Sequence, residues 1–242
     1  LVSSSLQSEN NVLRNGFALF PSDFDTSAYE FIFSTPGKML RAYGVSIFVT
    51  LAGTIASLFF SSMTAYVLSR KDVKYRNQMT FYIFFTTLFS GGLVPSYIIN
   101  VKYYHLKDTL VILLLANLFN VMYILILRNN ISNTIPDSIL ESAKMDGAND
   151  FSIFIKMILP LLKPALASIG LFTALNYWND WGTAMLYINK QKLFPLQYLL
   201  YKILSFSTFA EDIVRKNGAV SQLDTPKETL KLRSEERRVG KE

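Results

Sequence analysis

A charged stretch at residues 135–162 is the part of the sequence best suited to specific contacts. It reads IPDSILESAKMDGANDFSIFIKMILPLL and places acidic and basic side chains between two very hydrophobic segments. Glu141 and Asp146 can form ion pairs with basic groups of a partner. A charged segment of this kind has to contact something in water, so protein binding is the first hypothesis. The alternative is an ordinary amphipathic loop on the membrane surface.

The same stretch has the pattern of a helix–turn–helix hairpin. Thr134 can cap the first helix, and Pro136 fits its first turn, where a missing N–H costs nothing. Gly147 stands where this helix should end and supplies the left-handed residue that such an end usually needs. Asp150 can cap the second helix, which Pro160 interrupts. We therefore expect two short helices with a sharp reversal at Gly147.

A second polar group lies inside a hydrophobic run. Its members are Asn176, Trp178, Asn179, Asp180 and Trp181. An Asp at the centre of a span costs about 2.5–3.5 kcal/mol on insertion scales, so it normally faces a cavity or a partner. Aromatic faces beside amides and a carboxylate would suit a sugar in a substrate pathway. The alternative is an aromatic belt with Asn residues that hydrogen-bond between helices, and this reading also covers Asn117 and Asn120.

Composition excludes several kinds of active site. The chain has no cysteine and a single histidine, His105, which rules out disulfides and thiolate metal sites and argues against a histidine-based site. The Gly-Lys-Ser/Thr phosphate loop, His-Glu-x-x-His and Gly-x-Ser-x-Gly do not occur in the sequence. We therefore expect no cofactor and no catalytic residue, and any ATP must be bound by another subunit.

The hydrophobic runs indicate a membrane protein. Half of the 242 residues are hydrophobic and 17% are charged, against about 25% in typical soluble domains. Runs with at most one charge occupy residues 45–68, 78–101, 109–127 and 165–189. At about 1.5 Å per residue, such runs approach or exceed the roughly 30 Å hydrocarbon core as helices. The sequence thus predicts an all-α polytopic membrane protein with four visible spans and the hairpin at 135–162.

Small and helix-breaking residues refine this prediction. Gly53 and the Ala and Ser residues around it suit close helix packing in the first run. Gly91 and Gly92, followed by Pro95, predict a kink or a broken helix in the second run. Residues 194–210 are apolar with one central Lys and are expected to form an interfacial or loop helix.

Loop charges give an orientation. Loops 69–77 and 128–163 carry more Lys and Arg than loops 102–108 and 190–193. Lys and Arg are retained on the cytoplasmic side, which also accounts for the net charge of +6 without invoking nucleic acid. The hairpin is therefore expected in the cytoplasm.

This orientation predicts three regions. Residues 1–44 form an extracytoplasmic segment, and residues 45–231 form an incomplete transmembrane domain. We expect a further span before residue 1 and another after residue 230, because a chain does not usually export a long polar segment unaided. Residues 232–242, which include SEERRVGKE, are expected to be a non-native tail, since this ending resembles a translated sequencing adapter.

The hairpin also carries a spaced motif. Three residues separate Glu141-Ser142-Ala143 from Gly147, and nine more separate Gly147 from Met157-Ile158-Leu159-Pro160. This spacing resembles the EAA loop of ABC-importer permeases, with the pattern Glu-Ala-Ala, three residues, Gly, nine residues, Ile-x-Leu-Pro. Ser142 and Met157 depart from that pattern with side chains of similar size. The resemblance implies a helical bundle of the type I importer permease kind.

The resemblance also implies roles and partners. The residues that inherit coupling to an ATPase are Glu141, Ser142, Ala143, Asp146, Gly147, Ala148, Leu159 and Pro160, whereas Lys144 and Lys156 are expected to be solvated or lipid-facing. The implied partners are ABC ATPase subunits, a second permease subunit and an extracytoplasmic solute-binding protein. The implied location is the inner membrane of a bacterium, with several spans.

Three further runs point to a substrate class. Residues 89–97, 177–181 and 194–198 resemble the carbohydrate-uptake branch of this family, within it permeases for oligosaccharides or uronate oligomers. The implied function is transport of oligosaccharides by alternating access, driven by a separate ATPase. One alternative is a secondary transporter that uses an ion gradient through Asp180. The other is a membrane enzyme, which would need a polar catalytic cluster.

Overall fold

A computed structural model describes residues 36–89 and 91–217 of the chain. Within these residues every regular element is a helix and no strand occurs, which agrees with the predicted all-α class. The chain divides into two compact units, one up to Leu199 and one from Leu200 onward. Residues 1–35 of the expected segment 1–44 and the expected tail 232–242 lie outside the described residues, and residues 36–44 belong to the first helix, α4 (Pro36–Ser69).

The helices of the first unit are short, apart from α4 and α12. They are α4 (Pro36–Ser69), α5 (Arg76–Leu88), α6 (Leu93–Ile98), η1 (Ile99–Tyr103), α7 (Leu110–Leu115), α8 (Val121–Thr134), α9 (Asp137–Met145), α10 (Asp150–Ile153), η2 (Phe154–Ile158), α11 (Leu159–Leu161), α12 (Lys163–Asn179), α13 (Gly182–Tyr187) and η3 (Gln191–Leu193). Helix α14 (Leu196–Asn217) starts in the first unit and continues into the second, where a helix was expected.

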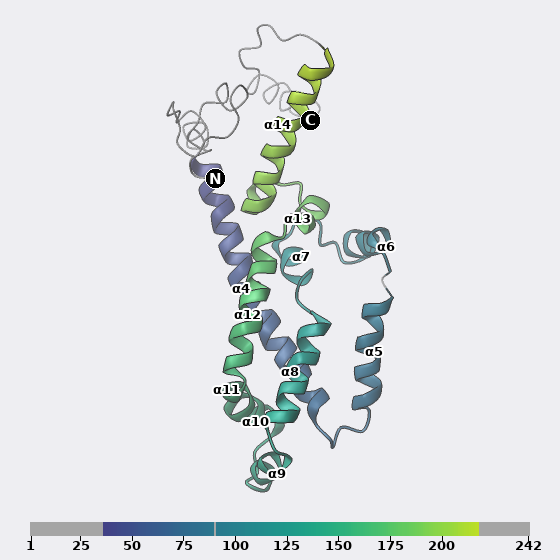
Figure 1. Cartoon of the computed structure of the whole chain (residues 1–242), viewed down its shortest axis with the longest axis vertical. Helices are drawn as coiled ribbons and strands as arrows, with labels where there is room; N and C mark the ends of the chain where they lie inside the picture. Colours follow the sequence, from purple (N-terminus) through teal and green to yellow (C-terminus); the bar gives the residue numbers. More distant parts are fainter. Residues whose placement is uncertain (1–35, 90, 218–242) are drawn as a thin grey trace. The chain divides into compact units, whose positions relative to one another are not determined.

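Helix α4 is the central element, because it packs against both α8 and α12 (Figure 1). Gly53 of α4 allows a close approach to α12, because a Cβ at this position would lie 2.6 Å from Cζ of Tyr177. Ser57, Ser61 and Ser62 of the same helix are buried. Small side chains let helix backbones approach in a membrane, where packing rather than hydrophobic transfer holds helices together. The predicted packing role of this run is confirmed.

One described helix, α4, is long and apolar enough to cross a membrane unbroken, over Gly37–Ser69. Two bent pairs also satisfy the length and composition limits, so the described residues hold up to three spans if each pair is one span. Arg76–Leu88 and Leu93–Tyr103 form a pair bent by 110°, and Asp150–Leu161 and Lys163–Asn179 form a pair bent by 80°. The break of the first pair lies at Gly92, which has φ 83°, as the Gly-Gly-Pro sequence predicted.

Three predicted span boundaries need correction. The helix expected from residue 45 begins at Pro36, and its 34 residues, at about 1.5 Å each, exceed the hydrocarbon core. The run 109–127 is divided into α7 and α8, because the side chain of Asn120 caps α8. The run 165–189 ends as a helix at Asn179, and Asp180 starts a new turn. Polar side chains that bond to the backbone compete with a continuous helix.

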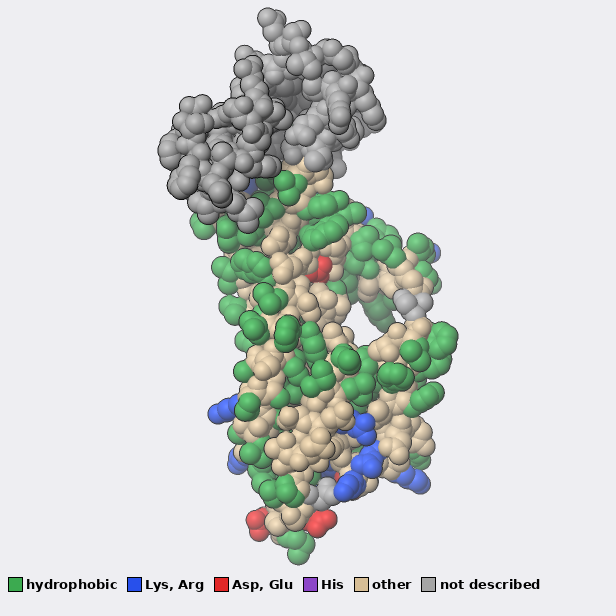
Figure 2. Space-filling model, in the orientation of Figure 1, with side chains coloured by type: hydrophobic (Ala, Val, Ile, Leu, Met, Phe, Trp, Pro, Cys, Tyr) green, Lys and Arg blue, Asp and Glu red, His purple; other side chains and the backbone are tan. Residues whose placement is uncertain are grey.

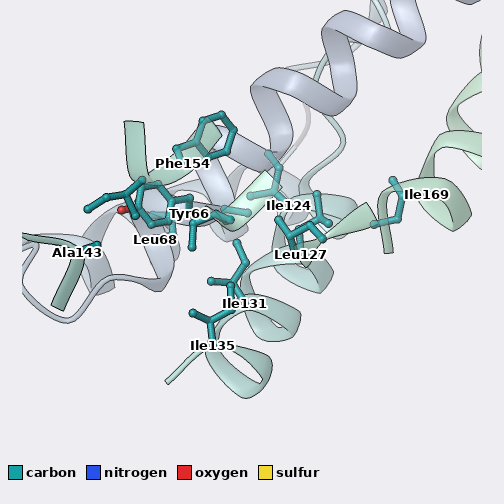
Figure 3. Packing of buried hydrophobic residues seen from close by; sticks show 13 residues of the cluster. Tyr66, Leu68, Ile124, Leu127, Ile131, Ile135, Ala143, Phe154 and Ile169 are labelled. Atoms are coloured by element: carbon teal, nitrogen blue, oxygen red, sulfur yellow. The ribbon is translucent and has the colours of Figure 1, made fainter. Parts of the chain in front are cut away.

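Buried side chains form two separate clusters along α4. The first, which we call the hairpin core, includes Tyr66, Leu127, Ile131, Phe154 and Ile158 and lies where the hairpin joins α4 and α8 (Figure 3). The second, which we call the break core, lies toward the helix breaks and includes Val49, Ile112, Tyr177, Ala184 and Tyr198. Many large apolar side chains elsewhere in the described residues are exposed, as expected for surfaces that face lipid or other subunits (Figure 2).

Candidate functional sites: the hairpin and a polar cluster at two helix breaks

The turn of the hairpin is fixed by its own backbone. Gly147 has φ 79°, and its N–H donates to the carbonyl of Lys144 at 3.0 Å. The N–H of Ala148 donates to the carbonyl of Ala143, also at 3.0 Å. These two bonds are those of a Schellman motif, which satisfies the last carbonyls of a helix and requires a left-handed residue. The predicted reversal at Gly147 is therefore present.

The caps of the two helices differ from the prediction. Thr134 is the last residue of α8, and Pro136 stands at the N-cap position of α9 without a side-chain bond. The second helix is capped by Asn149, not Asp150, since Oδ1 of Asn149 accepts a bond from the N–H of Ser152 at 2.7 Å. Asn149 has the extended backbone that a cap requires, whereas Asp150 is already helical.

The two faces of α9 have different surroundings. Ala143 is buried at 8% exposure in the hairpin core, and Ala148 packs against that core. Glu141, Ser142 and Asp146 are exposed, as Gly147 is. The two alanines thus fit the hairpin to its own bundle, a contact that the sequence did not reveal. The polar residues of the motif lie at the exposed tip.

Two residues of the hairpin were missed by the sequence reasoning. Met145 is 88% exposed at the end of α9, where an apolar, flexible side chain suits contact with another protein. The sequence feature that could have revealed Met145 is an apolar residue on the polar face of this helix. Lys144 was expected to be solvated or lipid-facing, but its Nζ donates to Oδ2 of Asp72 at 2.6 Å. That partner is too distant in the sequence to be recognised from spacing.

The second arm of the hairpin contains a π turn, Phe154–Ile158, directly before Pro160. Proline has no N–H, and its ring would clash with the carbonyl of Lys156 in a regular helix. The wider turn removes that conflict, and the N–H of Leu159 donates to the carbonyl of Phe154, five residues back. Leu159 faces the hairpin core and Pro160 is exposed. Such π turns occur frequently at functional sites.

Aromatic packing joins this arm to α4. Phe154, 1% exposed, stacks on Tyr66 with ring centroids 5.8 Å apart and meets Phe59 edge-on at 6.0 Å. Figure 3 shows Phe154 and Tyr66 next to each other in the hairpin core. Aromatic pairs of this kind stabilise by about 0.5–1.5 kcal/mol beyond the burial of area. The hairpin is thus rooted firmly although its tip is exposed.

Four charged residues surround this root, and we call them the Arg70 bridge: Arg70, Asp72, Lys144 and Asp150. The Arg70 guanidinium, 10% exposed, bonds to the carboxylates of both Asp72 and Asp150. The Arg70 guanidinium and, second, the Lys144 ammonium hold the pKa of the Asp72 carboxyl well below its usual range. Charged side chains gather toward the end of the molecule at which α9 lies (Figure 2).

The second site, the polar cluster, lies where two broken helices meet. Oδ2 of Asp180 accepts a bond from Nδ2 of Asn117 at 2.8 Å, and Oδ1 accepts the N–H of Thr183 at 3.0 Å. The hydroxyl of Tyr177 donates to the carbonyl of Leu114 at 2.7 Å, a group near the end of α7. Each break thus satisfies polar groups of the other, as broken helices in a membrane require.

An open hollow of about 480 Å³ adjoins these contacts. It is lined by Asn117, Leu175, Asn176, Asn179 and Asp180. The amides of Asn176 and Asn179 are exposed, so they can form further hydrogen bonds. Trp178 and Trp181 are not among its lining residues. Three of the five predicted pathway residues are therefore brought together, with Asn117 added from another helix.

Asn117 and Asn120 have different roles. Asn117 links the two helix breaks, in agreement with the predicted hydrogen bonding between helices. Asn120 instead caps α8, with Oδ1 accepting the N–H of Met122 at 3.0 Å. Among the described residues, His, Asp and Glu do not group into a site that could hold a metal ion.

Apolar helices, a rooted hairpin with a polar tip and a polar hollow that contains the carboxylate of Asp180 fit a transport component of a membrane. Residues 57–210 match the family described as binding-protein-dependent transport system inner membrane component, and the chain belongs to that family. It is the permease subunit of an ATP-driven importer and a multi-pass inner membrane protein. Family membership thus decides against the two alternatives, an ion-gradient-driven transporter and a membrane enzyme.

Individual relatives agree with this assignment. The chain is 40% identical over 232 residues to the polygalacturonan/rhamnogalacturonan transport system permease protein YtcP of Bacillus subtilis (strain 168), covering 96% of this chain and 79% of that protein. It is 38% identical over 228 residues to Protein LplC of the same organism, covering 94% and 75%. A solved bacterial ABC transporter involved in import of the acidic polysaccharide alginate matches with a TM-score of 0.75 at 35% identity, covering 83% of this chain and 71% of that one.

Proposed function

We propose that this permease subunit moves oligosaccharides by alternating access and that its hairpin receives the motion of a separate ATPase subunit in the cytoplasm. A second permease subunit and an extracytoplasmic solute-binding protein complete the importer. Family membership supports the ATP-driven class, and the names of the relatives support a carbohydrate substrate. Closure of the ATPase would displace the hairpin, and the attached helices would reorient the hollow at the polar cluster.

One observation carries the coupling role: the tip of the hairpin is exposed while its root is buried. Glu141, Ser142 and Asp146 are available to a partner, whereas Ala143 and Phe154 are held in the hairpin core. A loop lying on the membrane surface would instead turn its apolar face toward lipid. A rigid projection with polar contacts is the form that can transmit a displacement into the bundle.

Gly147 gives a clean test of this role. A Cβ at Gly147 would meet nothing within 4 Å, so the positive φ is the constraint that Gly147→Val violates. A β-branched residue there costs roughly 1–2 kcal/mol and should open the turn. In the complete importer reconstituted in vesicles, we expect sugar uptake to fall while ATP hydrolysis continues.

Gly44→Val is the matched control, because a Cβ at that helical glycine also meets nothing within 4 Å and its φ is not positive. It should leave uptake per ATP unchanged. Normal uptake in Gly147→Val would count against the coupling role.

The hollow at the polar cluster is the proposed contact site for the sugar. Amides bind hydroxyl groups as both donors and acceptors, and the exposed Asn176 and Asn179 supply two of them. Asn176→Leu and Asn179→Leu should raise the KM for uptake of labelled oligosaccharides, with neutral and uronate oligomers compared. Asn129→Leu, an exposed position of α8, is the control. An unchanged KM for every oligomer would remove the hollow from the pathway.

A further inference from the structure

The Arg70 bridge connects both arms of the hairpin to the end of α4. Nε of Arg70 donates to Oδ1 of Asp72 at 2.8 Å, and Nη1 bonds to Oδ1 of Asp150. Asp150 is the first residue of α10, and Lys144, on α9, donates to Asp72. One guanidinium therefore holds the second arm directly and the first arm through Asp72.

The surroundings of Arg70 distinguish this bridge from an ordinary surface ion pair. Exposed single pairs contribute about 0–1 kcal/mol. The Arg70 side chain is instead 10% exposed and lies over the ring of Tyr66, 5.7 Å from its centroid. Tyr66 in turn stacks on Phe154 of the hairpin. The contact with Tyr66 of α4 thus positions the guanidinium independently of its bonds to the carboxylates.

The end of α4 is itself held by two other arginines. Nε of Arg128 donates to the carbonyl of Leu68 at 3.2 Å, and Nη1 of Arg76 donates to the carbonyl of Ser69 at 3.5 Å. These bonds satisfy terminal carbonyls and place positive charge at a helix C-terminus, where it is favourable. Arg70 therefore extends from a helix end that α8 and the first residue of α5 keep in position.

We propose that Arg70 is a positioning residue that transmits displacement of the hairpin to α4; this inference rests on the proposed coupling function. Aromatic packing at Phe154 anchors the hairpin on α4 through its contacts with Phe59 and Tyr66. A planar guanidinium bonded to two carboxylates sets the orientation as well as the contact. With the bridge intact, the hairpin cannot move independently of α4. Because α4 packs on α8 and α12, the displacement reaches the helix that ends at the polar cluster.

The experiment uses the complete importer reconstituted in vesicles, with Arg70→Met, Arg70→Lys, Asp150→Asn and the double variant R70M/D150N. Three quantities are measured for each: copurified ATPase, ATP hydrolysis, and sugar imported per ATP. We expect Arg70→Met to retain the ATPase, because the exposed tip is intact, and to lower sugar per ATP roughly tenfold, within the usual range of coupling between sites. Arg70→Lys should be intermediate, since an ammonium cannot reproduce the planar fork.

Non-additive effects of the two substitutions would show that the Arg70–Asp150 contact is responsible. The double variant should be no worse than Arg70→Met, because both changes remove the same bond. Lys74→Met is the control: this exposed lysine of the same loop lies over the ring of its neighbour Tyr75, and sugar per ATP should not change. If Arg70→Met yields too little folded protein, Asp150→Asn alone decides, since it keeps the shape and the Arg70–Asp72 pair.

Two outcomes would overturn the inference. One is unchanged sugar per ATP in Arg70→Met and Asp150→Asn. The other is a loss of uptake that follows the loss of bound ATPase in strict proportion, which would show a purely structural role. Failure of the proposed function looks different, because Gly147→Val would then also import normally with its ATPase bound.

Discussion

The hairpin and the polar cluster lie at opposite ends of α12 and are held by different means. Before α12, the hairpin is shaped by bonds between residues close in sequence, such as the N–H of Ala148 to the carbonyl of Ala143. After α12, the polar cluster is assembled from residues far apart in sequence, such as Asn117 and Asp180. One region is a local structure docked onto the bundle, and the other exists only when two broken helices meet.

This difference matches the two roles that we propose for these regions. A locally closed hairpin can move as one body and keep its shape, which suits the receipt of a displacement. A cluster held by bonds between helices changes whenever those helices move, which suits a hollow that must open to alternate sides. The same helix, α12, connects them and packs on α4, so the proposed coupling would pass through this bundle.

The largest loss of stability is expected when the aromatic contact that anchors the hairpin to α4 is removed. Phe154→Ala leaves a cavity beside Tyr66 and should cost about 3–5 kcal/mol. Phe151→Ala is the matched control, because Phe151 is 61% exposed on the same arm. Limited proteolysis of the detergent-solubilised protein should show faster cleavage in the hairpin for the first variant and no change for the second. Equal cleavage in both would contradict the rooting contact.

A smaller loss is expected where α4 passes α12 near the polar cluster. Gly53→Ala places a Cβ 2.6 Å from Cζ of Tyr177, which must move, and overpacking of this kind costs about 1–3 kcal/mol. The displaced Tyr177 should also lose its bond to the carbonyl of Leu114. Thermal unfolding in detergent measures the loss, with Gly44→Ala as the control that loses no stability. A Gly53→Ala protein as stable as Gly44→Ala would exclude a tight crossing.

Asp180 sharpens the description of the polar cluster. Asp180→Ala leaves the N–H of Thr183 and the amide of Asn117 without their acceptor, at a cost of about 1–3 kcal/mol. Asp180→Asn keeps one carbonyl acceptor and should recover part of that stability. If the two variants unfold at the same temperature, the carboxylate is not a link between the breaks.

Sequence reasoning succeeded where structure is local. Gly147 was placed correctly because a helix end needs a left-handed residue, and the Gly91-Gly92 break was expected from the same backbone preference. The division of 109–127 was not expected, although Asn120 was visible in the sequence. Its capping role competes with its role in a continuous helix, and the sequence does not decide between them.

Long-range partners set the other limit. The sequence contained Arg70, Asp72 and Lys144 as separate loop charges, and nothing in their spacing joins the loop after α4 to the hairpin. Ala143 was assigned to a partner because the motif resembles a coupling loop, but packing against its own bundle buries it. The cluster at Asp180 was found as a polar group in an apolar run. Its hydrogen-bond partner Asn117 could be identified only from the fold.

The smallest expected effect concerns pH and the Arg70 bridge. The Arg70 guanidinium holds the pKa of the Asp72 carboxyl below its usual range. In the folded protein this carboxyl therefore stays ionised to a lower pH than it does in the unfolded chain. The contribution of a depressed carboxyl is fully present above its unfolded pKa, near 3.9, and is lost as pH falls through the folded value. Lowering the pH from 8 to 5 should therefore leave the hairpin in place.

Spin labels at the exposed positions Lys74 and Met145 can measure this directly, as the distance between the loop after α4 and the tip of the hairpin. We expect the same narrow distribution at pH 8 and pH 5, and a broader one in Asp72→Asn at both values. Broadening between pH 7 and pH 5 in the unmodified bridge would mean that a group titrating in that range holds the hairpin. The carboxylate pairs of Arg70 would then not be what ties it to α4.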